Sequence, residues 1–192
     1  MKMSLTLTCT VALLLMAWPV TELSAQGDSE VQAGLNMSPV ALNLQGLNRA
    51  LVGRGSYIVN GPGNCSNCHT AGVRFLAGGD PFLGQPKHEN TVNFLGGNRV
   101  FGGGILSRNL TPDVQGRPGG LTLEQFILTI RTGRDVKALP PVLPGPLDLL
   151  QVMPWPQYQN LTDDDIRAIY EYLRAITCVP GGPGLTTTRC GS

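Results

Sequence analysis

The sequence carries little charge and no local concentration of it. Charged residues make up 14% of the 192 positions, and the formal net charge is +1. No run of lysine and arginine is present, which argues against nucleic-acid binding. After one apolar segment near the N-terminus, no second stretch is apolar and long enough to span a membrane. The sequence also groups no acid–base pair or activated nucleophile, so it gives no sign of catalysis of its own.

Histidine and cysteine are scarce, and their arrangement narrows the possible sites. The chain has two histidines and five cysteines. One C-x-x-C motif is present, in the stretch Cys65-Ser66-Asn67-Cys68-His69. Structural zinc usually needs four ligands, and no second C-x-x-C or histidine pair supplies them. A thioredoxin-like dithiol follows a strand of a βαβ unit, whereas the pattern that precedes this motif is helical.

C-x-x-C-H is instead the signature of covalent haem attachment. The thiols of Cys65 and Cys68 flank a two-residue spacer and match the two vinyl groups of one haem. His69 follows directly and is placed to bind the iron, so the second axial ligand has to come from elsewhere. The 25 glycines and 15 prolines indicate a loop-rich chain, for which a buried porphyrin would provide a centre. We therefore expect one haem c with its iron.

The N-terminus has the pattern of an export signal. Lys2 precedes an apolar run from Leu5 to Trp18, and Ala25 offers a small residue for cleavage. We predict a signal peptide at residues 1–25 and a periplasmic location. An uncleaved anchor is the alternative, because the Ala-x-Ala pattern is imperfect. Cleavage removes one lysine and one glutamate and leaves the formal net charge at +1.

The remaining cysteines suggest a disulfide. Cys9 leaves with the signal peptide, and two others belong to the haem motif. Cys178 and Cys190 then form an even pair in an oxidising compartment, separated by a segment rich in glycine and proline. We expect a disulfide that ties the C-terminal tail, residues 179–192, to the end of the last helix. Two free thiols are the alternative.

The first half of the chain is expected to contain one helix. Residues 26–45 lack a clear period and are predicted to be a linker or a weakly ordered N-terminal arm. Apolar residues recur at near-helical spacing from 46 to 59. Gly53 is a poor helix former, so its presence suggests that another helix approaches closely. The expected neighbour is Tyr170 or Tyr172 of the terminal helix.

Two later helices are predicted from their start signals. Thr122 and Gln125 form a capping box, and Gly133 is placed as the C-cap of the same helix. Thr162 is the N-cap of the last helix, where three aspartates in the first turn suit the helix dipole. The apolar residues of this last helix repeat at i, i+3, i+4 and i+7: Ile166, Ile169, Tyr170, Leu173 and Ile176.

Regular pattern nearly vanishes between residues 71 and 120, where twelve of the glycines fall. A loop of this length is usually functional or disordered, and we expect it to wrap one edge of the haem. Short strands near 92–94 and 99–101 are the alternative. His88 lies in this region and is a lesser candidate for the second axial ligand. Its loop setting and polar neighbours favour a surface position.

Met153 is the predicted second axial ligand. It lies in the proline-dense segment 139–156, and proline stiffens such a connection. A methionine alone would be interpreted as ordinary apolar packing, but His/Met ligation is a standard pairing for haem c. Met37, the other methionine outside the signal peptide, falls in the unpatterned arm. Arg131 and Arg134 are candidates to pair with haem propionates, with solvated surface positions as the alternative.

These features resemble the class I cytochrome c family over about residues 46–177. An N-terminal helix, C-x-x-C-H, a late methionine loop and an aromatic-bearing terminal helix occur in that order. The closer likeness is to cytochrome c domains associated with periplasmic dehydrogenases. Three runs carry it: Asn109-Leu110-Thr111-Pro112-Asp113, Gly119-Gly120-Leu121-Thr122-Leu123-Glu124-Gln125-Phe126, and Met153-Pro154-Trp155 followed by Leu161-Thr162-Asp163-Asp164-Asp165.

The resemblance implies an all-α cytochrome c fold, with several helices around one covalently bound haem and a long glycine-rich loop insertion. The cytochrome c domain would span residues 46–178. Cys65 and Cys68 would carry the haem c, and His69 and Met153 would bind its iron. These two ligands are 84 positions apart, farther than in compact members, and the insertion accounts for the excess.

The favoured function is that of a periplasmic monohaem electron carrier and not an enzyme. With both axial positions filled, the iron offers no open site for substrate. The expected partners are a periplasmic dehydrogenase as electron donor and a terminal oxidase or another cytochrome as acceptor. One alternative is a haem c relay subunit fixed to a periplasmic dehydrogenase. A haem sensor or peroxidase with a labile methionine is the third class.

Overall fold

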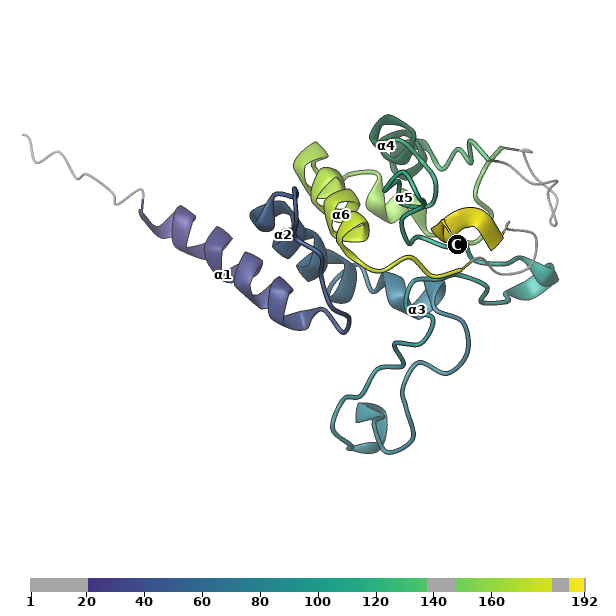
Figure 1. Ribbon diagram of the computed structural model, residues 1–192, viewed down its shortest axis with the longest axis horizontal. Coiled ribbons are helices and arrows are strands. Elements are labelled where there is room, and N and C mark those ends of the chain that lie inside the picture. The colour runs from purple at the N-terminus through teal and green to yellow at the C-terminus, as the bar shows by residue number, and fades with distance from the viewer. Residues whose placement is uncertain (1–20, 138–147, 181–186, 192) are drawn as a thin grey trace, which may run out of the picture.

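The computed structural model describes residues 21–137, 148–180 and 187–191. Within these ranges the chain folds into helices joined by irregular segments, and its β-pairing is limited to isolated bridges. Figure 1 shows α1, α2 and α6 side by side, with α4 and α5 on the far side of α6. The predicted all-α class is therefore confirmed.

Six α-helices and three short 3₁₀ helices are described. The α-helices are α1 (Thr21–Met37), α2 (Arg49–Asn60), α3 (Cys65–His69), α4 (Leu123–Thr132), α5 (Trp155–Tyr158) and α6 (Asp163–Ala175). The 3₁₀ helices are η1 (Pro81–Leu83), η2 (Gly102–Gly104) and η3 (Thr187–Cys190).

Helix α1 differs from the expected arm. Residues 26–37 are helical, although their sequence shows no clear apolar period. The reason is tertiary: Gly34 has no side chain to keep α2 away, and a Cβ there would lie 1.9 Å from the carbonyl oxygen of Gly53. The predicted signal peptide, residues 1–25, lies mostly outside the described residues and stays a prediction.

Helix α2 lies between α1 and α6, and glycines allow close approach on both sides. A Cβ on Gly55 would lie 1.9 Å from the carbonyl oxygen of Ala168 and 2.8 Å from the Cβ of Tyr172, both on α6. Real contacts do not reach such distances, so any larger residue would push the helices apart. The expectation that Gly53 faces the terminal helix is wrong, because Gly53 faces Val31 of α1.

The predicted helix starts are confirmed. Thr122 and Gln125 form both bonds of a capping box at the start of α4, and Gly133 ends that helix with a φ of 69°. Thr162 accepts a bond from the backbone N–H of Asp165 at the start of α6. These ends depend on local sequence, which explains why they could be predicted.

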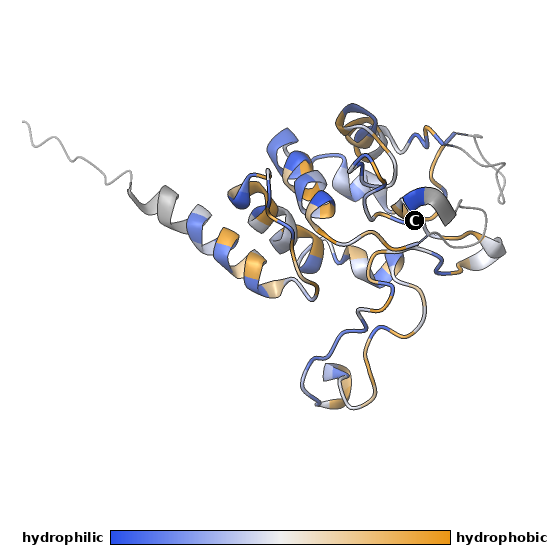
Figure 2. Cartoon of the chain, viewed as in Figure 1, coloured by the Kyte–Doolittle hydropathy of each residue, from blue (hydrophilic) through white to orange (hydrophobic). Residues whose placement is uncertain are grey.

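One apolar core joins the helices. Figure 2 shows that each of the larger helices carries both hydrophobic and hydrophilic residues. The hydrophobic positions of α6 point inward, and Phe126 of α4 meets Tyr170 with ring centroids 5.5 Å apart. Burial of each large apolar side chain contributes about 1.5–3 kcal/mol. The buried members are Val52, Ile58, Val59, Phe94, Leu95, Phe126, Ile130, Ile166, Ile169, Tyr170, Tyr172, Leu173, Ala175 and Ile176.

Residues 70–122 connect α3 to α4 with little regular structure, namely η1, η2 and isolated bridges. The part that carries η1 extends away from the helices, seen as the teal loop below α3 in Figure 1. The next part returns to the core. Leu95 is fully buried, and its N–H donates to the Thr70 hydroxyl over 3.1 Å.

A substitution at Gly55 tests the close packing of α2. We expect Gly55→Ala to lower the free energy of unfolding by about 3 kcal/mol or more, because the new methyl group meets the backbone of α6. Denaturant titration followed by far-ultraviolet circular dichroism measures this. Gly102→Ala is the control, since its Cβ meets open space. Equal stability of the two variants would contradict the packing.

Candidate functional site

The C-x-x-C-H motif forms helix α3, which begins just after a sharp reversal of the chain. Asn64 at its N-cap adopts a left-handed conformation, with φ 45° and ψ 39°, which asparagine tolerates better than most residues. Cys65 and Cys68 lie three positions apart, so their side chains share one face of the helix. Both thiols are free and half-buried. Helix α3 therefore presents two neighbouring thiols on one side.

His69, at the end of α3, is held in a defined orientation. Its Nδ1 lies 2.7 Å from the backbone carbonyl oxygen of Arg108. Because a carbonyl oxygen only accepts, this contact places the proton on Nδ1 and leaves the lone pair of Nε2 for a metal ion. Burial lowers the pKa of His69, and the bond to Arg108 partly offsets this. Both the geometry and the burial thus favour a neutral, ligating imidazole.

The surroundings of the thiols are apolar. Burial, with a smaller contribution from Cys68, raises the pKa of Cys65 to about 12. Tyr158 of α5 donates its hydroxyl to the carbonyl oxygen of Gly63 over 2.9 Å, and its own pKa is raised by burial and by the two nearby thiols. A thiol this hard to ionise is a poor nucleophile, so Cys65 is not activated in the absence of a bound group.

Met153 lies half-buried at the start of the segment that reaches the motif. Its side chain packs against the same core cluster as Cys65. Helix α5 begins two residues later, where the N–H of Trp155 donates to the Met153 carbonyl over 2.8 Å. The same helix carries Tyr158, whose hydroxyl bonds to Gly63. Helix α5 thus links the methionine loop to the chain just before α3.

The loop before Met153 is anchored to the end of α4. The N–H of Leu150 donates to the carbonyl of Gly133 over 2.8 Å, and the N–H of Asp135 donates to the carbonyl of Asp148 over 2.7 Å. These two bonds run between neighbouring extended segments. They fix the start of the methionine loop against a helix end, although residues 138–147 between the two segments are not described.

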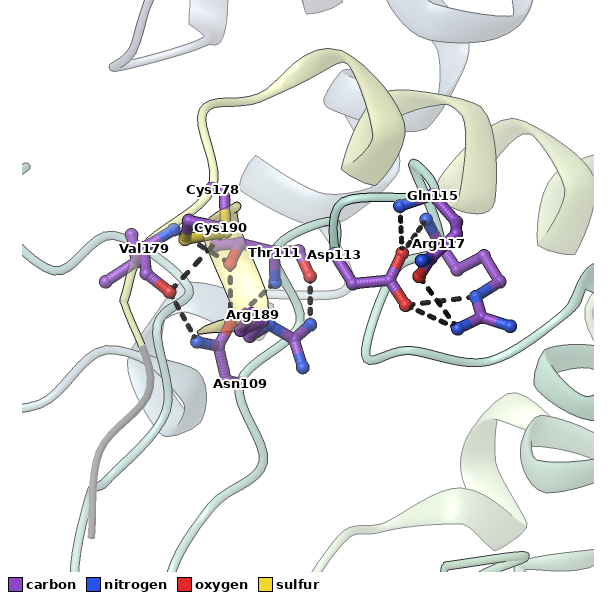
Figure 3. The surroundings of a disulfide bond; sticks show 9 residues. All are labelled: Asn109, Thr111, Asp113, Gln115, Arg117, Cys178, Val179, Arg189 and Cys190. Atoms are coloured by element: carbon purple, nitrogen blue, oxygen red, sulfur yellow. Dashed lines mark hydrogen bonds and ion pairs between the residues drawn. A yellow bond between two sulfur atoms is a disulfide. The ribbon is translucent and has the colours of Figure 1, made fainter. Parts of the chain in front are cut away.

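The C-terminal tail braces the loop that follows Arg108. The predicted disulfide between Cys178 and Cys190 is confirmed, with the two sulfur atoms 2.02 Å apart. Figure 3 shows the adjoining contacts, in which Asn109 donates its amide to the Val179 carbonyl over 2.9 Å. The N–H of Val179 in turn donates to the Thr111 hydroxyl over 3.0 Å. The tail therefore holds the chain immediately after the acceptor of His69.

The donor set fits haem c better than a bare metal ion. In the described part of the chain, no group of three or more His, Cys, Asp or Glu could hold a metal ion. The motif offers instead two free thiols and one oriented imidazole, and the thioether of Met153 packs against the same core cluster as Cys65. This is the set that a covalently attached, His/Met-ligated haem uses. The residue types present fit that group, and the role of Met153 as a ligand stays a prediction.

His88, Arg131 and Arg134, the other candidate residues, bond to residues outside the C-x-x-C-H motif. His88 is exposed in the loop that carries η1, and its N–H donates to the carbonyl of Gly79. Arg131 pairs with Asp163 over 2.6 Å, and Arg134 lies 3.5 Å from Asp148. Both arginines already have carboxylate partners within the protein. The surface alternatives are therefore favoured for these three side chains.

Two residues that contact the motif or its flank could not be identified from the sequence. Arg108 supplies a backbone carbonyl to His69, and any residue type can do that, so its identity gives no signal. Tyr158 lies in the short segment between Met153 and the last helix. Its aromatic character is the signal that the sequence offers. The bond to Gly63 could not be predicted, because the two residues are 95 positions apart.

The chain is similar to the cytochrome subunits of several dehydrogenases. It is 31% identical over 134 residues to the cytochrome c subunit of the quinone alcohol dehydrogenase of Gluconobacter oxydans (strain 621H), covering 69% of this chain and 23% of that protein. It is 31% identical over 127 residues to the fructose dehydrogenase cytochrome subunit of Gluconobacter japonicus, covering 65% and 21%. The gluconate 2-dehydrogenase cytochrome c subunit of Pantoea cypripedii is 30% identical over 125 residues, covering 65% and 23%.

These similarities cover most of this chain but little of the relatives. The chain spans less than a quarter of the length of these three relatives. No protein-family model matches the chain.

Removal of the disulfide tests the role of the tail. We expect Cys178→Ser with Cys190→Ser to lower the free energy of unfolding by about 2–3 kcal/mol, since the cross-link closes a short loop. Denaturant titration measures the change. Wild type under reducing conditions is the matched control and should lose a similar amount. An unchanged midpoint in the double variant would contradict the bracing role.

Proposed function

The chain belongs to the cytochrome c family, and we propose that it transfers single electrons through one covalently attached haem c. In this proposal Cys65 and Cys68 form the thioether bonds, and His69 and Met153 are the two axial ligands of the iron. One observation carries it above the others. Helix α3 places two free thiols on one face, beside an imidazole whose Nδ1 is fixed by the carbonyl of Arg108.

The chain's own residues would tune and protect the electron-transfer centre. When bound, the haem supplies an iron that gains and loses one electron. His69 would hold the iron through Nε2, because Nδ1 is engaged by the carbonyl of Arg108. Met153 would supply the second protein ligand, and with two protein ligands the iron would offer no open site to substrate or water. A thioether ligand raises the reduction potential, so the pair favours the reduced state.

We place this function in the periplasm, with export directed by residues 1–25. The protein would take electrons from a dehydrogenase and deliver them to a terminal oxidase or another cytochrome, without catalysis of its own. No helix in the described part of the chain is long and apolar enough to cross a membrane. The weak encounters of such a carrier need only small interfaces.

A second candidate is a haem relay subunit fixed to a dehydrogenase. The names of the relatives favour it, since they are cytochrome subunits of alcohol, fructose and gluconate dehydrogenases. Co-purification with a larger catalytic chain would support this form, whereas a monomer that exchanges electrons with several partners would support the free carrier. Rapid binding of carbon monoxide to the native protein would instead favour a sensor or peroxidase.

The optical spectrum of Met153→Ala tests the proposed ligand pair. We expect the wild-type ferric protein to show the weak near-infrared charge-transfer band of a methionine–iron bond, and the variant to lack it. Met37→Ala is the control and should keep the band, because Met37 ends α1 against Gly61. A band that persists in Met153→Ala would reject the assignment and return His88 as a candidate.

A further inference from the structure

We propose that Arg108 is a positioning residue that supports both axial ligands at once, through its backbone on the His69 side and through its guanidinium on the Met153 side. This inference rests on the proposed function. It assigns to the side chain a part that the backbone bond alone does not require.

Arg108 makes contacts on two sides, one with its backbone and the others with its guanidinium. Its carbonyl oxygen accepts the bond from His69 Nδ1 at 2.7 Å. Its guanidinium forms an ion pair with Asp135 and also donates to the backbone carbonyl of Lys137 over 2.9 Å. The Arg108 and Asp135 side chains are 33% and 19% exposed, so the pair is partly shielded from water. Shielding of this kind makes an ion pair stronger than a fully solvated one.

Asp135 lies in a segment that bonds to the start of the methionine loop. Its N–H donates to the carbonyl of Asp148, and the N–H of Leu150 donates to the carbonyl of Gly133. Met153 follows Leu150 by three positions. A continuous series of bonds therefore runs from His69 through Arg108 and Asp135 to the loop that carries Met153.

The backbone around Arg108 is also fixed from its other side. Asn109 and Thr111 bond to Val179 of the disulfide-linked tail. These contacts hold the backbone of Arg108 in place. Its side chain therefore holds Asp135 in a fixed position relative to this loop. Loss of the guanidinium would remove the tie between Arg108 and the 135–137 segment and so loosen the support of the methionine loop, while the backbone bonds of that loop and the carbonyl that holds His69 stay in place.

Arg117 provides a matched control in the same loop. It forms an ion pair with Asp113 over 2.9 Å, with side chains 44% and 11% exposed, and both partners belong to one turn. Arg117→Gln therefore removes one positive charge and one ion pair of similar exposure without touching the methionine segment.

The experiment measures how readily imidazole displaces the methionine ligand in the ferric holoprotein. We expect Arg108→Gln to tighten imidazole binding by about tenfold, the loss expected for a charge-assisted hydrogen bond. Asp135→Asn should have a similar effect, and the double variant should add little to either single change. Arg117→Gln should bind imidazole as the wild type does. Far-ultraviolet circular dichroism checks that each variant keeps its helices.

Two outcomes separate this inference from the proposed function. A wild-type protein without covalent haem or without the methionine band would overturn the proposed function itself. A normal wild type, in which Arg108→Gln and Arg117→Gln bind imidazole equally, would overturn only the positioning role of Arg108. Additive effects of Arg108→Gln and Asp135→Asn would overturn it as well.

Discussion

The site depends on one hydrogen bond, from Nδ1 of His69 to the backbone carbonyl of Arg108. This bond decides which ring nitrogen is free and in which direction it points. The residue that accepts it lies 39 positions later, beyond a loop with little regular structure. Several contacts hold that acceptor in place. The tail fixes the residues after it, and the Arg108 side chain contacts Asp135 and Lys137. The backbone of Asp135 in turn bonds to Asp148, in the segment before Met153.

Close helix packing provides the frame for this arrangement. Helix α2 leads directly into α3, so the position of the haem motif follows from how α2 is set between its neighbours. Gly55 lets α6 approach on one side, and Gly34 of α1 meets Gly53 on the other. The long glycine-rich connection needs no regular structure of its own, because it is held at Leu95 and at Arg108.

Local chemistry was predictable from the sequence, and tertiary placement was not. The C-x-x-C-H motif, the capping box at Thr122 and the disulfide of Cys178 and Cys190 follow from a few neighbouring or paired residues. Helix α1 could not be predicted, because it is stabilised by the packing of Gly34 against α2. Such a contact produces no apolar period in the sequence. Gly53 was correctly expected to allow a close approach, but its neighbour proved to be α1. A backbone acceptor such as the Arg108 carbonyl cannot be predicted from the sequence, because every residue type has a backbone carbonyl.

Nuclear magnetic resonance of the holoprotein with ¹⁵N-labelled histidine is the most direct measurement of the central claim. We expect His69 to carry a slowly exchanging proton on Nδ1, with Nε2 unprotonated and bound to the iron. His88, exposed on its loop, should show rapid exchange at both nitrogens. A rapidly exchanging Nδ1 proton on His69, or a proton on its Nε2, would contradict the account.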